Sequence, residues 1–154
     1  MRLKNSRTDT CFNAAIRCLS RKSYSEQELR KKMLLAGYVA VDIDATIEKL
    51  NEYGYLNDIE LSKRKFEQYL SKQQYSVRYI INKLRMRGLT TDGLKEEIKA
   101  ARQNEYDVAL LIVEKKNFNL GNERDKILRF LAGKGFSSEI ILKIFDGALN
   151  IDDS

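Results

Sequence analysis

Basic side chains are the residues of this 154-residue chain whose type and spacing could do chemistry. Clusters of basic side chains bind the phosphates of nucleic acids, because each phosphate that they neutralise releases condensed counterions and so drives association. The densest cluster lies between Ser76 and Arg87, where apolar residues at helical spacing turn inward and basic residues turn outward. The candidate contact residues for nucleic acid or an acidic protein surface are Arg30, Lys31, Lys32, Lys63, Arg64, Lys65, Tyr69, Lys72, Arg78, Lys83, Arg85 and Arg87.

The distribution of charge supports this hypothesis over the alternative that the basic runs are ordinary solvated surface. The net charge is +6, and it is uneven along the chain. Residues 1–55 carry 10 Lys and Arg against 7 Asp and Glu, residues 56–103 carry 11 against 6, and residues 104–154 carry 7 against 9. A single basic run would favour solvated surface, but several runs on a basic chain favour an anionic partner that contacts chiefly the middle third.

No arrangement of residues typical of an active site is visible in the sequence. Histidine, the commonest general base and metal ligand, is absent. Gly133, Lys134 and Gly135, followed by Ser137, superficially resemble a phosphate loop, but the preceding glycine of that motif is missing and no strand comes before it. We therefore expect a non-enzymatic protein with no catalytic residue, no cofactor and no metal.

The composition favours a helical globular protein. Apolar residues make up 43% of the chain, and proline, which breaks helix interiors, does not occur. The longest apolar run, Val108 to Val113, is far shorter than the roughly 20 residues of a membrane-spanning helix. Met1 to Thr10 are polar and do not resemble a secretory signal. These features predict a cytoplasmic protein with no membrane partner, and we expect it to be a monomer.

Cys11 and Cys18 are seven residues apart, which places them on one face of a helix. Their axial separation of roughly 10 Å is too long for a disulfide, and half a metal site would lack its other ligands. We expect each cysteine to be a small core residue.

The chain contains an internal repeat, which becomes apparent when Gly37, Gly88 and Gly135 are aligned. Apolar residues then fall into register four and eight positions before each glycine, and one, six, ten and thirteen positions after it. The glycine is expected to adopt the left-handed conformation that ends a helix, with the following apolar residue packed back on that helix.

Each repeat is predicted to contain three helices, the second of which ends at the repeat glycine. Ser25 and Ser76 are expected N-caps, with Glu28 completing a capping box, and Thr90 or Thr91 and Ser137 or Ser138 are candidate caps of third helices. The predicted first helices are 9–21, 57–72 and 105–116, the second helices are 25–36, 76–87 and 122–134, and the third helices are 41–53, 91–102 and 137–150.

The predicted fold class is therefore all-α: three tandem three-helix repeats, with nine helices, in an elongated and curved array. The repeats span residues 1–55, 56–103 and 104–154 and carry net charges of +3, +5 and −2, so that the middle repeat is the most basic.

The repeats resemble those of the RecX family. The resemblance to the first RecX repeat lies in Tyr24-Ser25, Glu28-Leu29, Met33 and Gly37-Tyr38. That to the second lies in Gly54 to Asp58, Tyr75-Ser76, Ile80 to Leu84 and Arg87 to Leu89, and that to the C-terminal signature in Ile127 to Leu131, Gly135 to Ser137 and Ile140. Leu61 and Lys65 depart from the family pattern, which has aromatic residues in this first helix of the middle repeat.

This resemblance implies a regulator, usually inhibitory, of the RecA nucleoprotein filament, which lies in the filament groove and restrains growth and ATP hydrolysis. The basic middle repeat would then face single-stranded DNA within the filament or an acidic RecA surface. Reversing the charges of Arg78, Lys83, Arg85 and Arg87 is expected to abolish filament binding without unfolding the chain. The alternatives are a general DNA-binding repeat protein without a RecA partner, and a purely protein-binding scaffold.

Overall fold

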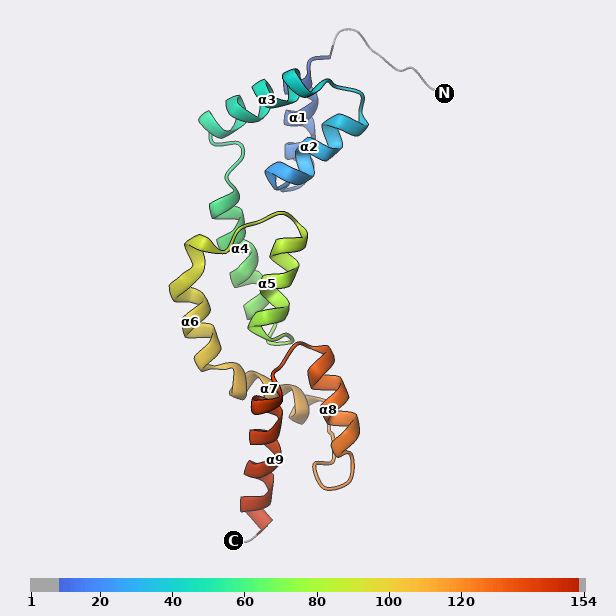
Figure 1. Cartoon of the computed structure of the whole chain (residues 1–154), viewed down its shortest axis with the longest axis vertical. Helices are drawn as coiled ribbons and strands as arrows, with labels where there is room; N and C mark the ends of the chain where they lie inside the picture. The colour runs from blue at the N-terminus through green and yellow to red at the C-terminus, as the bar shows by residue number, and fades with distance from the viewer. Residues whose placement is uncertain (1–8, 153–154) are drawn as a thin grey trace. The chain divides into compact units, whose positions relative to one another are not determined.

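The computed structural model describes residues 9–152, with the side chains of residues 9–148. Within this range the chain forms nine α-helices and no strand (Figure 1). None of the described helices is long and apolar enough to cross a membrane. Most of the polar segment Met1–Thr10 lies outside the described residues. The helices are α1 (Cys11–Arg21), α2 (Glu26–Leu35), α3 (Ala40–Glu52), α4 (Asp58–Ser71), α5 (Val77–Met86), α6 (Lys95–Gln103), α7 (Glu105–Lys115), α8 (Arg124–Gly133) and α9 (Ser138–Asp152).

The helices confirm the predicted all-α repeat, with two local differences. A 3-10 turn, Asp92–Leu94, precedes α6, and Thr91 forms no side-chain cap there. α8 begins later than predicted because the chain before it forms turns around Asn119, whose side chain accepts a hydrogen bond from Gly121 N–H at 2.9 Å.

The repeat glycines end the second helices as predicted. Gly37, Gly88 and Gly135 have φ angles of +96°, +74° and +90°. After α8, Phe136 N–H donates to the Leu131 carbonyl at 3.1 Å, and Gly135 N–H donates to the Ala132 carbonyl at 3.0 Å. This pair of bonds is the Schellman motif, and the same pair closes α2. The Gly-Lys-Gly sequence is thus a helix terminus rather than a phosphate loop.

The predicted serine caps are also present. Ser25 and Glu28 form the complete capping box of α2. Ser76 Oγ accepts a hydrogen bond from Tyr79 N–H at 3.0 Å, and Ser137 Oγ accepts one from Ile140 N–H at 3.3 Å.

The chain divides into two compact units, each with its own buried residues. The first unit runs to Leu61 and includes Arg87–Thr90, and the second comprises Ser62–Met86 and the chain from Thr91 onward. The first unit has a core built on α1, α2 and α3, where Cys11 is buried and Cys18 packs partly buried against the cluster, both as free thiols. The second unit has a core built on α7, α8 and α9. The repeat boundaries at residues 55 and 103 remain a prediction.

Most members of the aligned apolar columns are buried, and Tyr38, Ile98, Ala101 and Ala148 are only half-buried. The residues eight positions before the glycines, Leu29, Ile80 and Ile127, are all 0% exposed. In α6, by contrast, Ile98 is only half-buried, and no residue of this helix is fully buried. The third helix of the middle repeat therefore packs less deeply than its counterparts, and Leu94 in the preceding 3-10 turn supplies the buried contact.

A hydrogen-bonded junction joins repeat 1 to repeat 2 inside the first unit. Ser25 Oγ donates a hydrogen bond to the Arg87 carbonyl, and the Asp58 carboxylate accepts one from Glu26 N–H at 3.0 Å. The Arg87 guanidinium donates to both carboxylate oxygens of Glu28, from Nε at 2.8 Å and from Nη2 at 3.0 Å. The start of α2 thereby contacts Asp58, the first residue of α4, and Arg87, the residue that follows α5.

An equivalent junction joins repeat 2 to repeat 3 inside the second unit. Ser76 N–H donates to the Lys134 carbonyl at 3.2 Å, and the Glu105 carboxylate accepts from Val77 N–H at 2.7 Å. Each of these four residues stands at the same distance from its repeat glycine as its counterpart in the first junction. The structural repeat thus extends from the helices to the contacts between successive repeats.

Two carboxyl groups of the first junction respond oppositely to their surroundings. The hydrogen bonds from Arg87 hold the pKa of Glu28 below its usual value, and the Ser25 N–H adds to this effect. Burial raises the pKa of Asp58, and its hydrogen bond from Glu26 N–H only partly opposes the rise.

The second junction predicts that Gly135→Ala destabilises the chain more than Gly37→Ala. Both changes place a Cβ at positive φ, which costs about 1 to 2 kcal/mol. At Gly37 the new methyl group meets no atom within 4 Å, whereas at Gly135 it would displace Ser76 Oγ and approach Tyr79 Cβ to 3.2 Å. Loss of the serine cap adds about 1 kcal/mol. Urea denaturation of both variants measures the difference, and equal losses would contradict the close approach at Gly135.

The Glu28–Arg87 pair predicts a pH-dependent contribution to stability. Because the pKa of Glu28 is lowered on folding, its contribution is fully present above the ordinary value of 4.5 and is lost as the pH falls through the lowered pKa. The wild-type chain should therefore exceed Glu28→Gln in unfolding midpoint at neutral pH, and the two midpoints should converge in acid. A constant difference from about pH 7 to about pH 3 would show that the ion pair does not contribute.

Candidate nucleic-acid interface

The outer face of α5 is basic, as the sequence predicted. Val77, Ile80, Ile81 and Leu84 are buried, while Arg78 and Arg85 are exposed. Lys83 is half-buried, with its ammonium group 5.4 Å from the centre of the Tyr79 ring. This helix therefore presents three cations on its outer surface.

Arg87 has a different role from the other basic residues of this segment. Its guanidinium is held by the Glu28 carboxylate and also donates to the Ser23 carbonyl at 3.3 Å. Its side chain is 25% exposed, and reversing its charge would place a carboxylate against Glu28. The four-residue charge reversal would thus damage the first junction, so a test of the surface should leave Arg87 unchanged.

The predicted contact residues of α4 differ in how far they are engaged. Lys63 pairs with Glu97 at 3.4 Å, and Lys65 donates to the side chain of Gln68 at 3.1 Å. Arg64 is exposed. Just beyond the helix, the Lys72 ammonium lies 5.4 Å from the centre of the Tyr69 ring.

The basic residues of the first repeat lie on α2, in the first unit. Arg30 pairs with both Glu26 and Asp44, so its charge is neutralised locally. Lys32 donates to the Tyr24 hydroxyl at 3.1 Å, and Lys31 is exposed. This cluster should therefore bind an anion more weakly than its sequence suggests.

The structure adds basic residues that the sequence analysis missed. Lys115 and Lys116, at the end of α7, line one pocket together with Lys134 and with Lys72 from the middle repeat. The net charge of −2 for residues 104–154 gave no indication of these lysines, because a sum over the whole repeat includes acidic residues that mostly lie elsewhere in the sequence. One signal in the sequence could have indicated them: Lys115 lies in the last turn of its helix, where basic residues are favoured.

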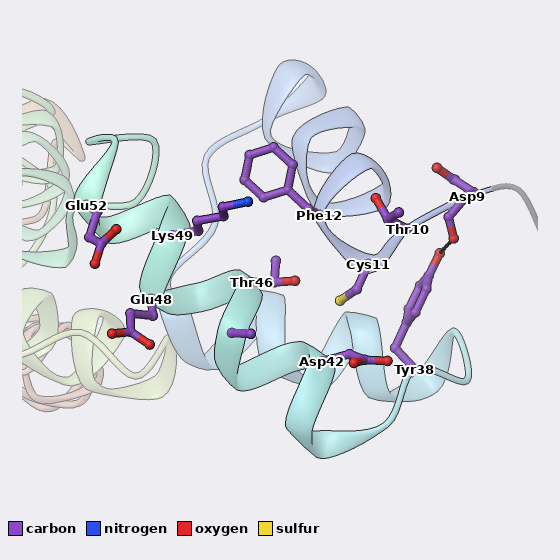
Figure 2. Close-up of a pocket in the computed structure, with 11 residues that line it drawn as sticks. Asp9, Thr10, Cys11, Phe12, Tyr38, Asp42, Thr46, Glu48, Lys49 and Glu52 are labelled. Carbon is purple, nitrogen blue, oxygen red and sulfur yellow. Dashed lines mark hydrogen bonds between the residues drawn. The ribbon is translucent and has the colours of Figure 1, made fainter.

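A larger pocket, of about 550 Å³, lies between α1 and α3 in the first unit (Figure 2). Asp42, Glu48 and Glu52 from α3 line it, with Phe12 and the Cys11 thiol opposite. These carboxylates disfavour an anionic ligand. The pocket is therefore not a candidate for phosphate binding.

Known proteins with similar sequences cover nearly the whole chain. Residues 11–50, which contain α1 to α3, match the family model described as RecX, first three-helix domain. Regulatory protein RecX of Clostridium botulinum (strain Eklund 17B) is 30% identical over 151 residues, covering 92% of this chain and 70% of that protein. Regulatory protein RecX of Vibrio vulnificus (strain CMCP6) is 29% identical, covering 86% of this chain and 88% of that protein.

Solved structures show the same fold. The crystal structure of RecX from Lactobacillus salivarius superposes with a TM-score of 0.74 at 21% identity, covering 89% of this chain and 93% of that one. A second crystal structure of a regulatory protein RecX gives a TM-score of 0.75 at 17% identity, covering 88% and 71%. From the sequence relationship, with the fold in agreement, we conclude that the chain belongs to the RecX family of regulatory proteins.

Proposed function

We propose that this chain binds the RecA nucleoprotein filament in the cytoplasm and inhibits its growth and ATP hydrolysis. The observation that carries the proposal is the 30% identity to a regulatory protein RecX over 92% of the chain. The chain acts by binding and not by catalysis, and it needs no cofactor. It acts as a monomer.

The chemistry of the described surface supports an anionic partner. Arg78, Lys83 and Arg85 project from one helix, and none of them forms an ion pair with a carboxylate in the described part of the chain. Such cations gain affinity from phosphate groups through counterion release. On this proposal α5 contacts single-stranded DNA within the filament or an acidic surface of RecA.

A second candidate function is general DNA binding without a RecA partner. The exposed cations of α5 also support it, because phosphate contacts by themselves carry no sequence information. The two functions differ in their requirement for RecA. Binding that requires RecA-coated DNA favours the first, and equal binding to bare DNA with a steep salt dependence favours the second.

RecA-dependent ATP hydrolysis on single-stranded DNA tests the proposed function directly. Increasing amounts of this protein should lower the hydrolysis rate, because a bound regulator restrains the filament. Bovine serum albumin at equal concentration serves as the protein control. A rate that stays constant through a large excess of this chain would refute the proposal.

Charge reversal on α5 tests the proposed contact surface. The variant Arg78→Glu/Lys83→Glu/Arg85→Glu should lose most of the inhibition, since three cations become three anions. The matched control is Lys95→Glu/Lys99→Glu/Arg102→Glu on α6, which makes the same charge change on a helix of the same unit. Circular dichroism verifies folding, and equal loss of inhibition by both variants would exclude a specific role of α5.

A further inference from the structure

A pocket of about 320 Å³ in the second unit is lined by four lysines, Lys72, Lys115, Lys116 and Lys134, beside the ring of Phe130. We call it the lysine pocket. No acidic residue lines it, and none of its lysines forms an ion pair with a carboxylate among residues 9–148. Four ammonium groups around one pocket repel one another, and a bound anion would relieve that repulsion.

The two junctions explain why the charge of Lys134 is available. Lys134 stands in repeat 3 where Arg87 stands in repeat 2, one residue before the repeat glycine. Arg87 is neutralised by Glu28, but the residue equivalent to Glu28 at the second junction is Tyr79. The carboxylate that neutralises the first cation is therefore absent at the second.

Aromatic rings replace that carboxylate as the support for the lysine. Tyr79 stacks on Tyr75 with ring centres 4.4 Å apart, and the Lys134 ammonium lies 5.2 Å from the centre of the Tyr75 ring. It also lies 5.5 Å from the centre of the Phe130 ring, which is 5.3 Å from the ammonium of Lys116. A ring attracts a cation without cancelling its charge, so the lysines are held in place and remain able to bind an anion.

Cations and rings continue beyond the pocket. On one side the Tyr75–Tyr79 stack leads to Lys83 on α5, whose ammonium is 5.4 Å from the Tyr79 ring centre. On the other side Phe130 contacts Phe118, and Lys126 lies over the Phe118 ring at 5.4 Å while pairing with Glu123 at 3.0 Å. A strip in which pairs of rings lie between cations fits a polymer with repeated phosphates and bases.

We infer that the lysine pocket binds one nucleotide of single-stranded DNA, with its phosphate on the lysines and its base against the aromatic residues. The pocket volume suits one small ligand group, and only an unpaired base has a face free to stack on a ring. The strip beyond the pocket favours a strand over a free nucleotide. This inference rests on the nucleic-acid contact in the proposed function and assigns it residues of the third repeat.

Fluorescence anisotropy of a labelled oligothymidylate of about 12 nucleotides measures this binding without RecA. The variant Lys72→Gln/Lys115→Gln/Lys116→Gln removes three pocket cations that are exposed, and it leaves Lys134 and its junction in place. The affinity should fall about tenfold or more, and the slope of log K against log salt should flatten by about 2.

The matched control is Lys95→Gln/Lys99→Gln/Arg102→Gln, which removes three exposed cations of α6 in the same unit. It should retain near wild-type affinity. Equal weakening by both variants would mean that only net charge matters and would overturn the pocket. Tighter binding of duplex than of single strand, or binding of ATP without oligonucleotide binding, would overturn the proposed ligand.

Base stacking has its own reporter, since the chain contains no tryptophan. In the variant Phe130→Trp, the oligothymidylate should quench the new fluorescence, and inorganic phosphate should not. Quenching by neither ligand, in a variant that still binds the oligonucleotide, would overturn the placement of the base.

Failure of this inference and failure of the proposed function are distinguishable. A chain that inhibits RecA but does not bind the oligonucleotide contradicts the lysine pocket alone. A chain that binds the oligonucleotide through the pocket lysines but leaves RecA unaffected supports the pocket and contradicts the proposed function.

Discussion

The junction between successive repeats depends on one constraint: the second helix of a repeat must be followed by a left-handed residue, so that the start of the preceding repeat's second helix can approach the carbonyl just before that residue. Glycine meets this constraint at Gly88 and Gly135, because a side chain there would overlap Gln27 or Ser76. The approach satisfies groups that helix ends otherwise leave unpaired. The Lys134 carbonyl and the Val77 N–H both find partners across the second junction. Helix termination and repeat stacking are therefore one structural requirement.

Much of the fold could be predicted because its determinants are local. The serine caps, the glycine turns and the apolar spacing each act within about one or two turns of a helix. The burial of Leu29, Ile80 and Ile127 at 0% follows directly from that spacing. The shallow packing of α6 did not follow from it. In this helix the columns ten and thirteen positions after the repeat glycine contain the apolar residues Ile98 and Ala101, but their burial depends on how closely the neighbouring helices approach.

The candidate site was harder to predict, because charges act across long sequence separations. The sequence shows that Arg87 is basic but not that Glu28, 59 residues away, neutralises it. It likewise separates Lys72 from Lys115 and Lys134, although all three line one pocket. Counting charge by repeat assumes that each repeat acts alone. The junctions invalidate that assumption, since they bring residues of neighbouring repeats into contact.

The two junctions also show how a repeated skeleton can acquire different surfaces. A cation precedes the repeat glycine in both, as Arg87 and as Lys134. At the first junction Arg87 forms an ion pair with Glu28, and its hydrogen bonds to the Glu28 carboxylate lower the pKa of that group. At the second, Tyr79 takes the place of the acid, and the lysine lies over aromatic rings. Tyr79 thus fills the position that Glu28 occupies at the first junction. The cation at the first junction is held in an ion pair, whereas the cation at the second junction keeps its charge for a ligand. The Arg87 and Lys134 carbonyls accept their hydrogen bonds from Ser25 Oγ and Ser76 N–H, and these two bonds do not involve the charge of either cation, so the exchange of the acid for a ring leaves this contact between repeats in place.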